Sequence, residues 1–190
     1  HWLMPAVKAF GLLQNDCPVE FSAEIEHNAL DALLSDDLDL VLTTDVRQEQ
    51  QVSFQPLFSL ELKAYLYPEH PLAQQTLILP QDIAGCDLLS YPIPLERQDL
   101  FRFFLKKNQF FGRQRQVGQA SQILQLVAAG EGIAVLPAWL AEPFASQGLI
   151  VTRPLGDAGL KRQMYLASRR DDSSSATQAF YQLLRRFSPQ

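Results

Sequence analysis

The chain has few of the residues from which metal sites and disulfide frameworks are built. Its 190 residues include two cysteines, Cys17 and Cys86, and three histidines. None of these share the short spacings of zinc sites. We therefore expect two reduced thiols, no metal and no cofactor. Cys86 follows a predicted helical turn and is expected to pack rather than to react.

Motifs of catalysis and nucleotide binding are also missing. The sequence has no Gly-x-Gly-x-x-Gly, no Walker A pattern and no Gly-x-Ser-x-Gly nucleophile elbow. Gly130 and Gly132 follow a predicted helix, so they are typical of a helix end and its turn. A hydrolase triad of His27, Asp45 and Ser121 would need a geometry that sequence spacing does not reveal. We expect that the chain is not an enzyme.

A basic surface and a long apolar run are missing as well. The formal net charge is −5, and the positive residues are scattered pairs such as Lys106–Lys107, Arg169–Arg170 and Arg185–Arg186. We therefore expect that this segment does not itself bind DNA. No apolar run approaches the length of a membrane span, and no signal-peptide pattern opens the chain. These features predict a soluble, cytoplasmic protein.

What the sequence does contain is an alternation of predicted strands and helices. Such alternation favours an α/β fold with parallel sheets and helices on both faces. The predicted strands are 19–25, 38–45, 52–58, 60–67, 87–91, 115–118, 133–136, 149–152 and 163–168. The predicted helices are 1–13, 29–34, 80–84, 95–108, 121 up to the glycine at 130, 137–147 and 177–187.

Two interruptions of this alternation predict a two-part organisation. The segments 68–72 and 152–161 are expected to be crossings between two subdomains. The first subdomain is then 1–67 with 162–190, and the second, 68–161, is inserted into it. A cleft between the two subdomains is expected. Because a helix opens the chain, we also expect a strand of the same fold upstream of it.

Polar loops follow three predicted strands, and in open parallel sheets such loops gather at the carboxyl edge, where ligands bind. Hydroxyls and N–H groups suit a carboxylate, and Asp45 or Glu24 suits an ammonium group. Ser121 is an N-cap candidate for a helix whose first N–H groups favour anions. For Thr43, Ser121 and His27, a capping or surface role is the alternative. The predicted site residues are Thr43, Thr44, Asp45, Tyr91, Pro92, Ile93, Gln119, Ala120, Ser121 and, at a strand-to-helix turn, His27 and Asn28.

Three segments resemble those of LysR-type transcriptional regulators. Val127–Pro137 resembles the family's VAAGxGIAxLP segment, and Glu69–Ala73 its HPLA turn. Asp37–Leu42 resembles its G-x-x-D-L-x-L strand, with Asp37 where glycine is usual. The matches lie in the expected order, and the resemblance covers essentially the whole chain.

The resemblance implies an effector-sensing domain with a type II periplasmic-binding-protein-like fold. That fold has two Rossmann-like subdomains around a central cleft, and the domain pairs as a homodimer, or forms a tetramer in the full-length protein. The family binds DNA through a winged helix-turn-helix, which this chain lacks, and has no membrane partner. The family's first strand, whose loop contributes ligand contacts, is absent too.

Within the family, the likeness is greatest to activators of methionine biosynthesis that respond to homocysteine. It rests on the segments 39–45, 89–92, 137–139 and 147–152. The implied effector is homocysteine, with its carboxylate at Gln119–Ser121 and the threonine hydroxyls, its ammonium group at Asp45 and its thiol near Tyr91 and Ile93. A solute-binding protein of a transporter, which shares the fold, is the alternative and would need a signal peptide.

Overall fold

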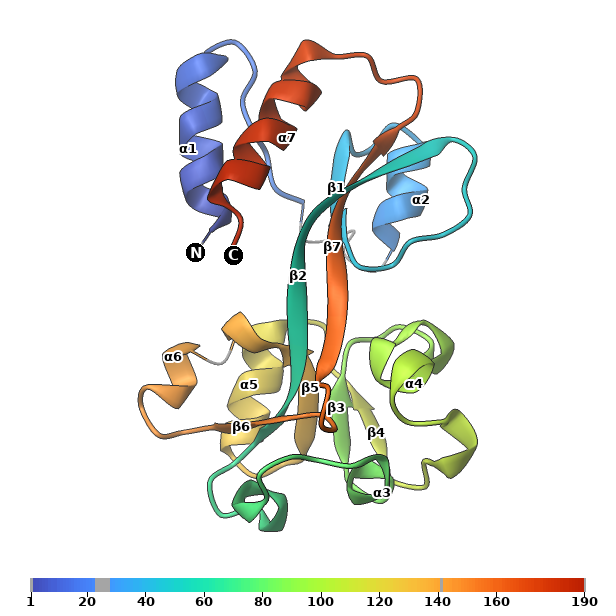
Figure 1. Ribbon diagram of the computed structural model, residues 1–190, viewed down its shortest axis with the longest axis vertical. Helices are drawn as coiled ribbons and strands as arrows, with labels where there is room; N and C mark the ends of the chain where they lie inside the picture. The colour runs from blue at the N-terminus through green and yellow to red at the C-terminus, as the bar shows by residue number, and fades with distance from the viewer. Residues whose placement is uncertain (1, 23–27, 141, 190) are drawn as a thin grey trace. The chain divides into compact units, whose positions relative to one another are not determined.

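The computed structural model of the chain describes residues 2–22, 28–140 and 142–189. The chain forms two compact units, the first made of 1–59 and 163–190 and the second of 60–162. Two strands, β2 (Val52–Leu66) and β7 (Leu160–Arg169), carry the chain between the units (Figure 1). From the sequence, two strands, 52–58 and 60–67, were predicted in place of β2, with the first crossing after residue 67. The observed strand is continuous, so the chain passes from one unit to the other inside it.

In the first unit, β1 (Leu40–Thr43) pairs antiparallel with β7, and β7 also neighbours β2. The prediction of a parallel sheet is wrong here. The rule of parallel pairing applies when a crossover helix connects two strands of one sheet, whereas β1 pairs with a strand from the far end of the chain.

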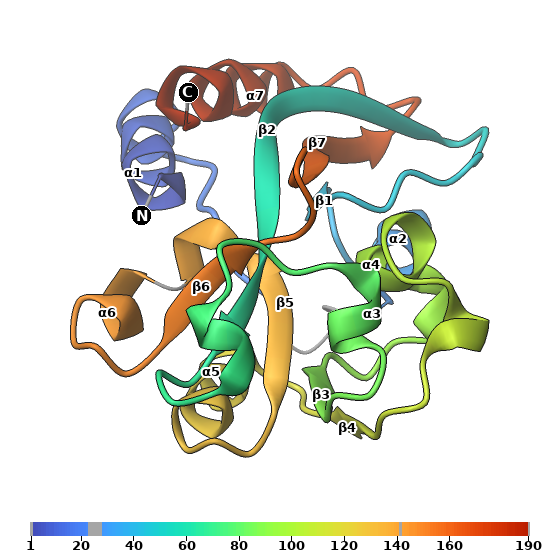
Figure 2. The ribbon, with the colours of Figure 1, turned by 60° about the horizontal axis from the view of Figure 1, so that its bottom comes forward.

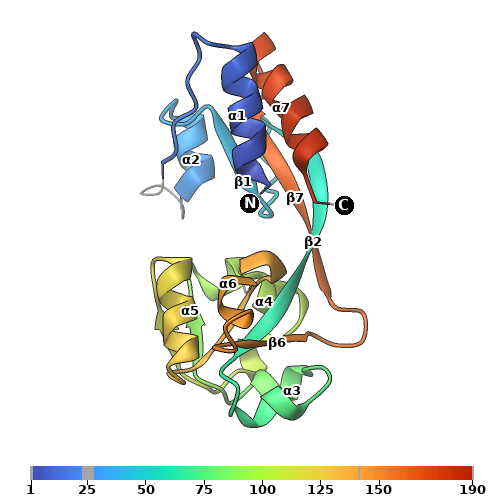
Figure 3. The same ribbon diagram turned by 90° about the vertical axis from the view of Figure 1, so that its left-hand side faces the viewer.

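Helices cover both faces of this sheet, as predicted. α1 (Leu3–Leu13) and α7 (Ser175–Phe187) lie side by side (Figure 3), and the Phe10 and Phe180 rings meet edge to face at 5.0 Å. Leu166 of β7 joins their core. Its neighbour Ala167 packs instead with α2 (Ala29–Leu34). Because successive side chains of a strand point to opposite faces, the two cores lie on opposite sides of the sheet.

The turn between α2 and β1 is held by Arg169 of β7. Its guanidinium donates to the carbonyl oxygens of Leu33, at 3.0 Å, and Leu38, at 2.6 Å, and pairs with Asp36 and Asp39. Asp36 has φ +65°. The backbone conformation that favours glycine therefore falls on Asp36, one residue before Asp37, which stands where glycine is usual in the segment that 37–42 resembles.

The second unit contains a five-stranded mixed sheet in the order β6-β2-β5-β3-β4. The strand β3 runs parallel to both β4 and β5, while β2 runs antiparallel to β5 and β6 (Figure 2). The prediction of parallel strands thus holds for the three strands that helical connections join. The bounds are Leu88–Ser90 for β3, Gln114–Gln116 for β4, Ile133–Pro137 for β5 and Val151–Pro154 for β6.

Helix α5 (Ala120–Ala128) packs against β3 and β5 through its buried Ile123, Leu124 and Val127. The other helices of this unit are short: α3 is Pro80–Ile83, α4 is Asp99–Phe103 and α6 is Glu142–Ala145. The helix predicted over 95–108 is wrong, because α4 is flanked by two separate 3-10 turns. The backbone breaks at Gln98, which is extended and turns its side chain inward. The helix predicted over 137–147 is also divided, into a 3-10 turn and α6, and residue 141 lies outside the described residues.

Residues 19–22, predicted to begin a strand, have no regular secondary structure. Residues 23–27, the rest of that predicted strand with Glu24 and His27, lie outside the described residues. The predicted order of the remaining elements is confirmed. Alternating hydrophobicity identified strands and 3.6-residue periodicity identified helices wherever one face of the element is buried.

The turn between α5 and β5 depends on Gly132. Its φ is +151°, and a Cβ there would lie 2.6 Å from the carbonyl oxygen of Asp87. That oxygen accepts the N–H of Ile133 at 2.9 Å, where β5 comes alongside β3. The close approach of the two backbones therefore needs a residue without a side chain.

We predict that Gly132→Ala destabilises the domain by about 3 kcal/mol, since backbone strain and overpacking each cost about 1–3 kcal/mol. Gly148→Ala is the matched control, because Gly148 also has a positive φ, +70°, but a Cβ there has no neighbour within 4 Å. The control should lose only about 1 kcal/mol. Urea denaturation measures both, and equal losses in the two variants would contradict the packing argument.

His70 caps the short 3-10 turn Pro71–Gln74 with its ring. Its Nδ1 accepts the N–H of Leu72 at 3.1 Å, and its ring meets that of Tyr67 edge to face. Only the unprotonated Nδ1 accepts this hydrogen bond. Burial lowers the pKa of His70 below its ordinary value of 6.5.

A lowered pKa in the folded state means that the unfolded chain binds more protons below pH 6.5. His70 therefore contributes stability above that pH, and the contribution is lost as the pH falls through the window between 6.5 and the folded-state pKa. His70→Asn keeps an acceptor for the Leu72 N–H but does not titrate. We predict that urea unfolding free energies between pH 7.5 and 5 fall less steeply in this variant than in the parent. Equal slopes would contradict this role of the ring.

Candidate functional site

Two of the predicted loops lie at one edge of the second unit's sheet. The loop Tyr91–Ile93 follows β3, and the segment that ends at Gln119 follows β4. Because β3 and β4 are parallel neighbours, both segments leave the sheet at its carboxyl edge. The N–H of Val117 donates to the carbonyl oxygen of Ser90 at 2.8 Å and extends the pairing beyond the strand ends. The structure thus brings these two parts of the predicted site to adjacent strands.

The N-terminus of α5 has no side-chain cap. Its N-cap residue is Gln119, which makes no side-chain cap hydrogen bond, and Ser121 is an exposed residue of the first turn. The prediction that Ser121 caps the helix is therefore wrong, because the helix begins one residue earlier, at Ala120. The first N–H groups of a helix have no intrahelical acceptors and carry a partial positive charge. This end of α5 is suited to an anionic group.

Since Ser121 does not cap α5, Ser121→Ala should change the unfolding free energy by less than about 0.5 kcal/mol. Ser174 is the matched control, because its hydroxyl accepts the N–H groups of Ala176 and Thr177 at the start of α7. Ser174→Ala should cost about 1 kcal/mol. Urea denaturation of the two variants tests the assignment, and an equal loss in both would mean that Ser121 does cap its helix.

The loop after β3 is tied to the interior of its unit by Gln98. The Gln98 amide nitrogen donates to the carbonyl oxygen of Ile93 at 2.9 Å. The N–H of Ile93 donates to the carbonyl oxygen of Tyr91 at 2.8 Å, which turns the chain. Tyr91 is half-buried against the core of α5 and β5, whereas Pro92 is exposed. The sequence analysis did not identify Gln98, because it lay inside a segment predicted to be helical.

In the first unit, the loop after β1 is stabilised by its own side chains. The hydroxyl of Thr43 accepts the N–H of Asp45 at 2.9 Å. The Asp45 carboxylate accepts the Nε–H of Arg47 at 3.3 Å, and Arg47 also reaches Asp31. Thr44, which lies between Thr43 and Asp45 in the sequence, is half-buried. Asp45, predicted to receive an ammonium group, already contacts a guanidinium.

Of the fourth predicted part of the site, His27 lies outside the described residues. Asn28 is exposed and takes the N-cap position of α2, where its side chain makes no cap hydrogen bond. The Asn28 side chain therefore does not cap α2. The α2 helix is stabilised instead by the packing of Leu30 and Leu33.

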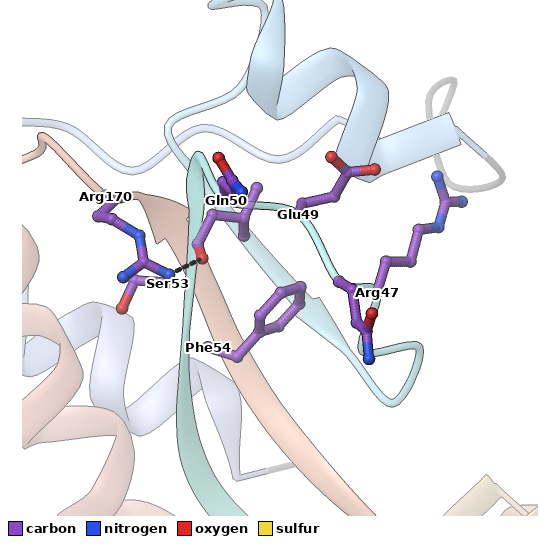
Figure 4. A pocket seen from close by; sticks show the side chains of 8 residues that line it. Arg47, Glu49, Gln50, Ser53, Phe54 and Arg170 are labelled. Atoms are coloured by element: carbon purple, nitrogen blue, oxygen red, sulfur yellow. Dashed lines mark hydrogen bonds between the residues drawn. The ribbon is translucent and has the colours of Figure 1, made fainter.

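An open pocket of about 560 Å³ lies in the first unit, beside the start of β2 (Figure 4). Both arginines of its lining already have partners: Arg47 contacts Asp31 and Asp45, and Arg170 donates to the carbonyl oxygen of Val52 at 3.3 Å. The pocket's lining thus holds the loop before β2 in place. The sequence analysis did not predict it. It is lined by Arg47, Gln48, Glu49, Gln50, Val52, Ser53, Phe54 and Arg170.

Both cysteines are free thiols. Burial, followed by the charges of Asp82 and Asp87, raises the pKa of Cys86. Its Sγ donates to the carbonyl oxygen of Asp82 at 3.2 Å, so it is a protonated, packed thiol rather than a nucleophile. Within residues 2–22, 28–140 and 142–189, no group of three or more His, Cys, Asp or Glu side chains is placed to hold a metal ion. Among the described helices, none has the length and hydropathy needed to cross a bilayer.

Comparison with known protein families shows to which family this architecture belongs. The family model of the LysR substrate binding domain matches residues 1–188. The chain belongs to this family. The two α/β units thus form a LysR substrate-binding domain. Solved regulatory domains of the family have the periplasmic-binding-protein-like fold, and the predicted fold class is confirmed.

Among curated proteins, this LysR domain is 37% identical over 181 residues to the HTH-type transcriptional regulator MetR of Salmonella typhimurium. It is 36% identical to MetR of Escherichia coli K12. The alignments cover 95% of this chain but 57% of those proteins, so the chain spans little more than half the length of its curated relatives. These relatives are transcriptional regulators, and the chain is a regulatory domain rather than an enzyme.

Among solved structures, the regulatory domain of MetR from N. meningitidis matches this LysR domain with a TM-score of 0.83 and 31% identity, covering 98% of this chain and 87% of that one. The effector binding domain of QuiR in complex with shikimate matches with a TM-score of 0.76 and 22% identity, over 98% of this chain and 90% of that one. The second likeness bears on the fold alone.

Proposed function

We propose that the chain is the effector-sensing domain of a MetR-like transcriptional regulator that responds to homocysteine. The observation that carries the proposal is the 37% identity to curated MetR across 95% of the chain. A site that fits an amino acid supports it, because α5 offers an uncapped N-terminus for a carboxylate. The transporter alternative has no support, since the similar curated proteins are transcriptional regulators.

We further propose that the full-length protein binds DNA through a helix-turn-helix part outside this chain. It controls methionine-biosynthesis genes and is located in the cytoplasm. It acts as a homodimer, or as a tetramer of full-length chains. The exposed Met4 and Leu12 of α1, with 53% and 74% of their surfaces accessible, support a surface for self-association. The acidic net charge of −5 agrees with DNA contact elsewhere.

For the effector itself, we propose contacts at the sheet edge of the second unit, where the carboxylate binds at Gln119–Ser121. Thr43 and Thr44 of the first unit stay proposed hydroxyl donors. The thiol lies against Tyr91, Pro92 and Ile93. Asp45 remains the proposed acceptor for the ammonium group, which then replaces or joins the Arg47 contact. His27 and Asn28 complete the proposed site.

The affinity of such a small ligand is limited, and dissociation constants on the order of micromolar to millimolar follow from its size. Sensing further requires that homocysteine bind one conformation of the regulator better than another. A ligand with equal affinity for both conformations shifts no population.

We predict that calorimetric titration of this domain detects saturable binding of homocysteine, and weaker or no binding of methionine, cysteine and homoserine. Ser121→Ala and Thr44→Ala should each weaken homocysteine binding about fivefold, the equivalent of one lost hydrogen bond of about 1 kcal/mol. Both side chains are polar and not fully buried, so the fold should persist.

Ser174→Ala, at the start of α7, is the binding control, because Ser174 caps a helix that is not part of the proposed site. It should bind as the parent does. If Ser121→Ala and Thr44→Ala both bind homocysteine with the affinity of the parent, the proposed site is wrong. If the parent binds a different amino acid, that amino acid becomes the proposed effector in place of homocysteine, and the proposed site is kept.

A further inference from the structure

In the loop Tyr91–Ile93, the Tyr91 carbonyl oxygen and both backbone polar atoms of Ile93 form hydrogen bonds within the second unit. The Tyr91 carbonyl oxygen accepts from the N–H of Ile93 at 2.8 Å and from the Ser90 hydroxyl at 3.4 Å. The Ile93 carbonyl oxygen accepts from Gln98 at 2.9 Å. Pro92 is exposed and Ile93 is partly exposed, so the loop presents two apolar side chains to solvent.

Gln98 is the side chain that holds the Ile93 end of the loop. It is 9% exposed, and a buried amide is costly unless it is hydrogen-bonded. Because a carbonyl oxygen accepts and never donates, the contact with Ile93 identifies the Gln98 atom as the nitrogen Nε2. The same nitrogen lies 3.4 Å from the Ser90 hydroxyl.

Ser90 connects this anchor to the sheet. Its hydroxyl accepts from Gln114 of β4 at 2.7 Å and donates to Tyr91. A network of three side chains, Ser90, Gln98 and Gln114, thus joins the end of β3, the neighbouring strand and the turn before α4. Such a connected polar network favours one loop conformation over others.

We propose that Gln98 is a positioning residue for effector specificity. It holds the Tyr91–Ile93 loop so that Pro92 and Ile93 contact the uncharged end of the effector, while the charged end binds at the N-terminus of α5. The inference rests on the proposed function above and deepens it. The discriminating part of the ligand is then its thiol, which an apolar surface accepts better than a hydroxyl because a hydroxyl loses more hydration.

The test compares the parent with Gln98→Met, which keeps the length of the side chain and removes its hydrogen bonds. Homocysteine and homoserine differ in a thiol against a hydroxyl, so the ratio of their dissociation constants measures the contact with the uncharged end. Calorimetry of Gln98→Met should show homocysteine binding weakened about fivefold. The ratio of the homoserine dissociation constant to the homocysteine dissociation constant should fall toward one. A merely structural role would lower both affinities equally and leave the ratio unchanged.

Gln147→Met is the matched control. Gln147 also donates its amide nitrogen to a backbone carbonyl oxygen, that of Pro143 at 2.8 Å, but in the turn that follows the short helix α6. The control should keep both the affinity and the ratio. A control that changes the ratio as much as Gln98→Met does would overturn the assignment to Gln98.

Amide hydrogen exchange at Ile93 supplies a readout that needs no ligand. Gln98→Met should speed this exchange about tenfold at constant global stability. Unchanged exchange overturns the positioning role, and faster exchange with an unchanged ratio overturns the contact with the uncharged end. If the parent binds neither amino acid, the proposed function fails and the specificity role fails with it, while the exchange rate still decides whether Gln98 holds the loop.

Discussion

The close contact of β5 with β3 determines the arrangement of the second unit. Ile133 donates to the carbonyl oxygen of Asp87 where Gly132 leaves no room for a side chain. This contact fixes the start of β5 and, through the short turn before it, the end of α5. Helix α5 can then bury Ile123 and Val127 against the strands. Its N-terminus follows β4 at the carboxyl edge of the sheet.

The proposed site follows from that arrangement by parallel pairing. Loops after β3 and β4 leave the sheet at one edge because the strands run in the same direction. One loop brings an apolar surface supported by Gln98, and the other leads into a helix whose first N–H groups lack a side-chain cap. Together they match an amino acid that has an anionic end and an apolar end. In the first unit, Asp45 is already paired with Arg47, an internal contact that any ligand cation proposed to bind Asp45 has to replace or join.

Much of the fold could be predicted from the sequence, because the predicted elements bury one face each. The periodicity of Leu3, Phe10 and their neighbours identified α1, and the apolar run before Pro137 identified β5. Helix 95–108 was mispredicted because the apolar spacing of Leu100 and Phe104 was extended in both directions beyond α4, past the backbone breaks at Gln98 and Phe104. The antiparallel pairing of β1 with β7 joins residues more than 120 positions apart, and local patterns carry no information about it.

Binding of the effector at the carboxyl edge of the second unit can be tested by following the backbone amide chemical shifts of the labelled domain during titration with homocysteine. We expect the largest shifts at Ala120, Ser121 and Gln122, with smaller ones at Tyr91 and Ile93. Saturable shifts confined to the pocket beside β2, or spread over the first unit with none at the start of α5, would contradict it.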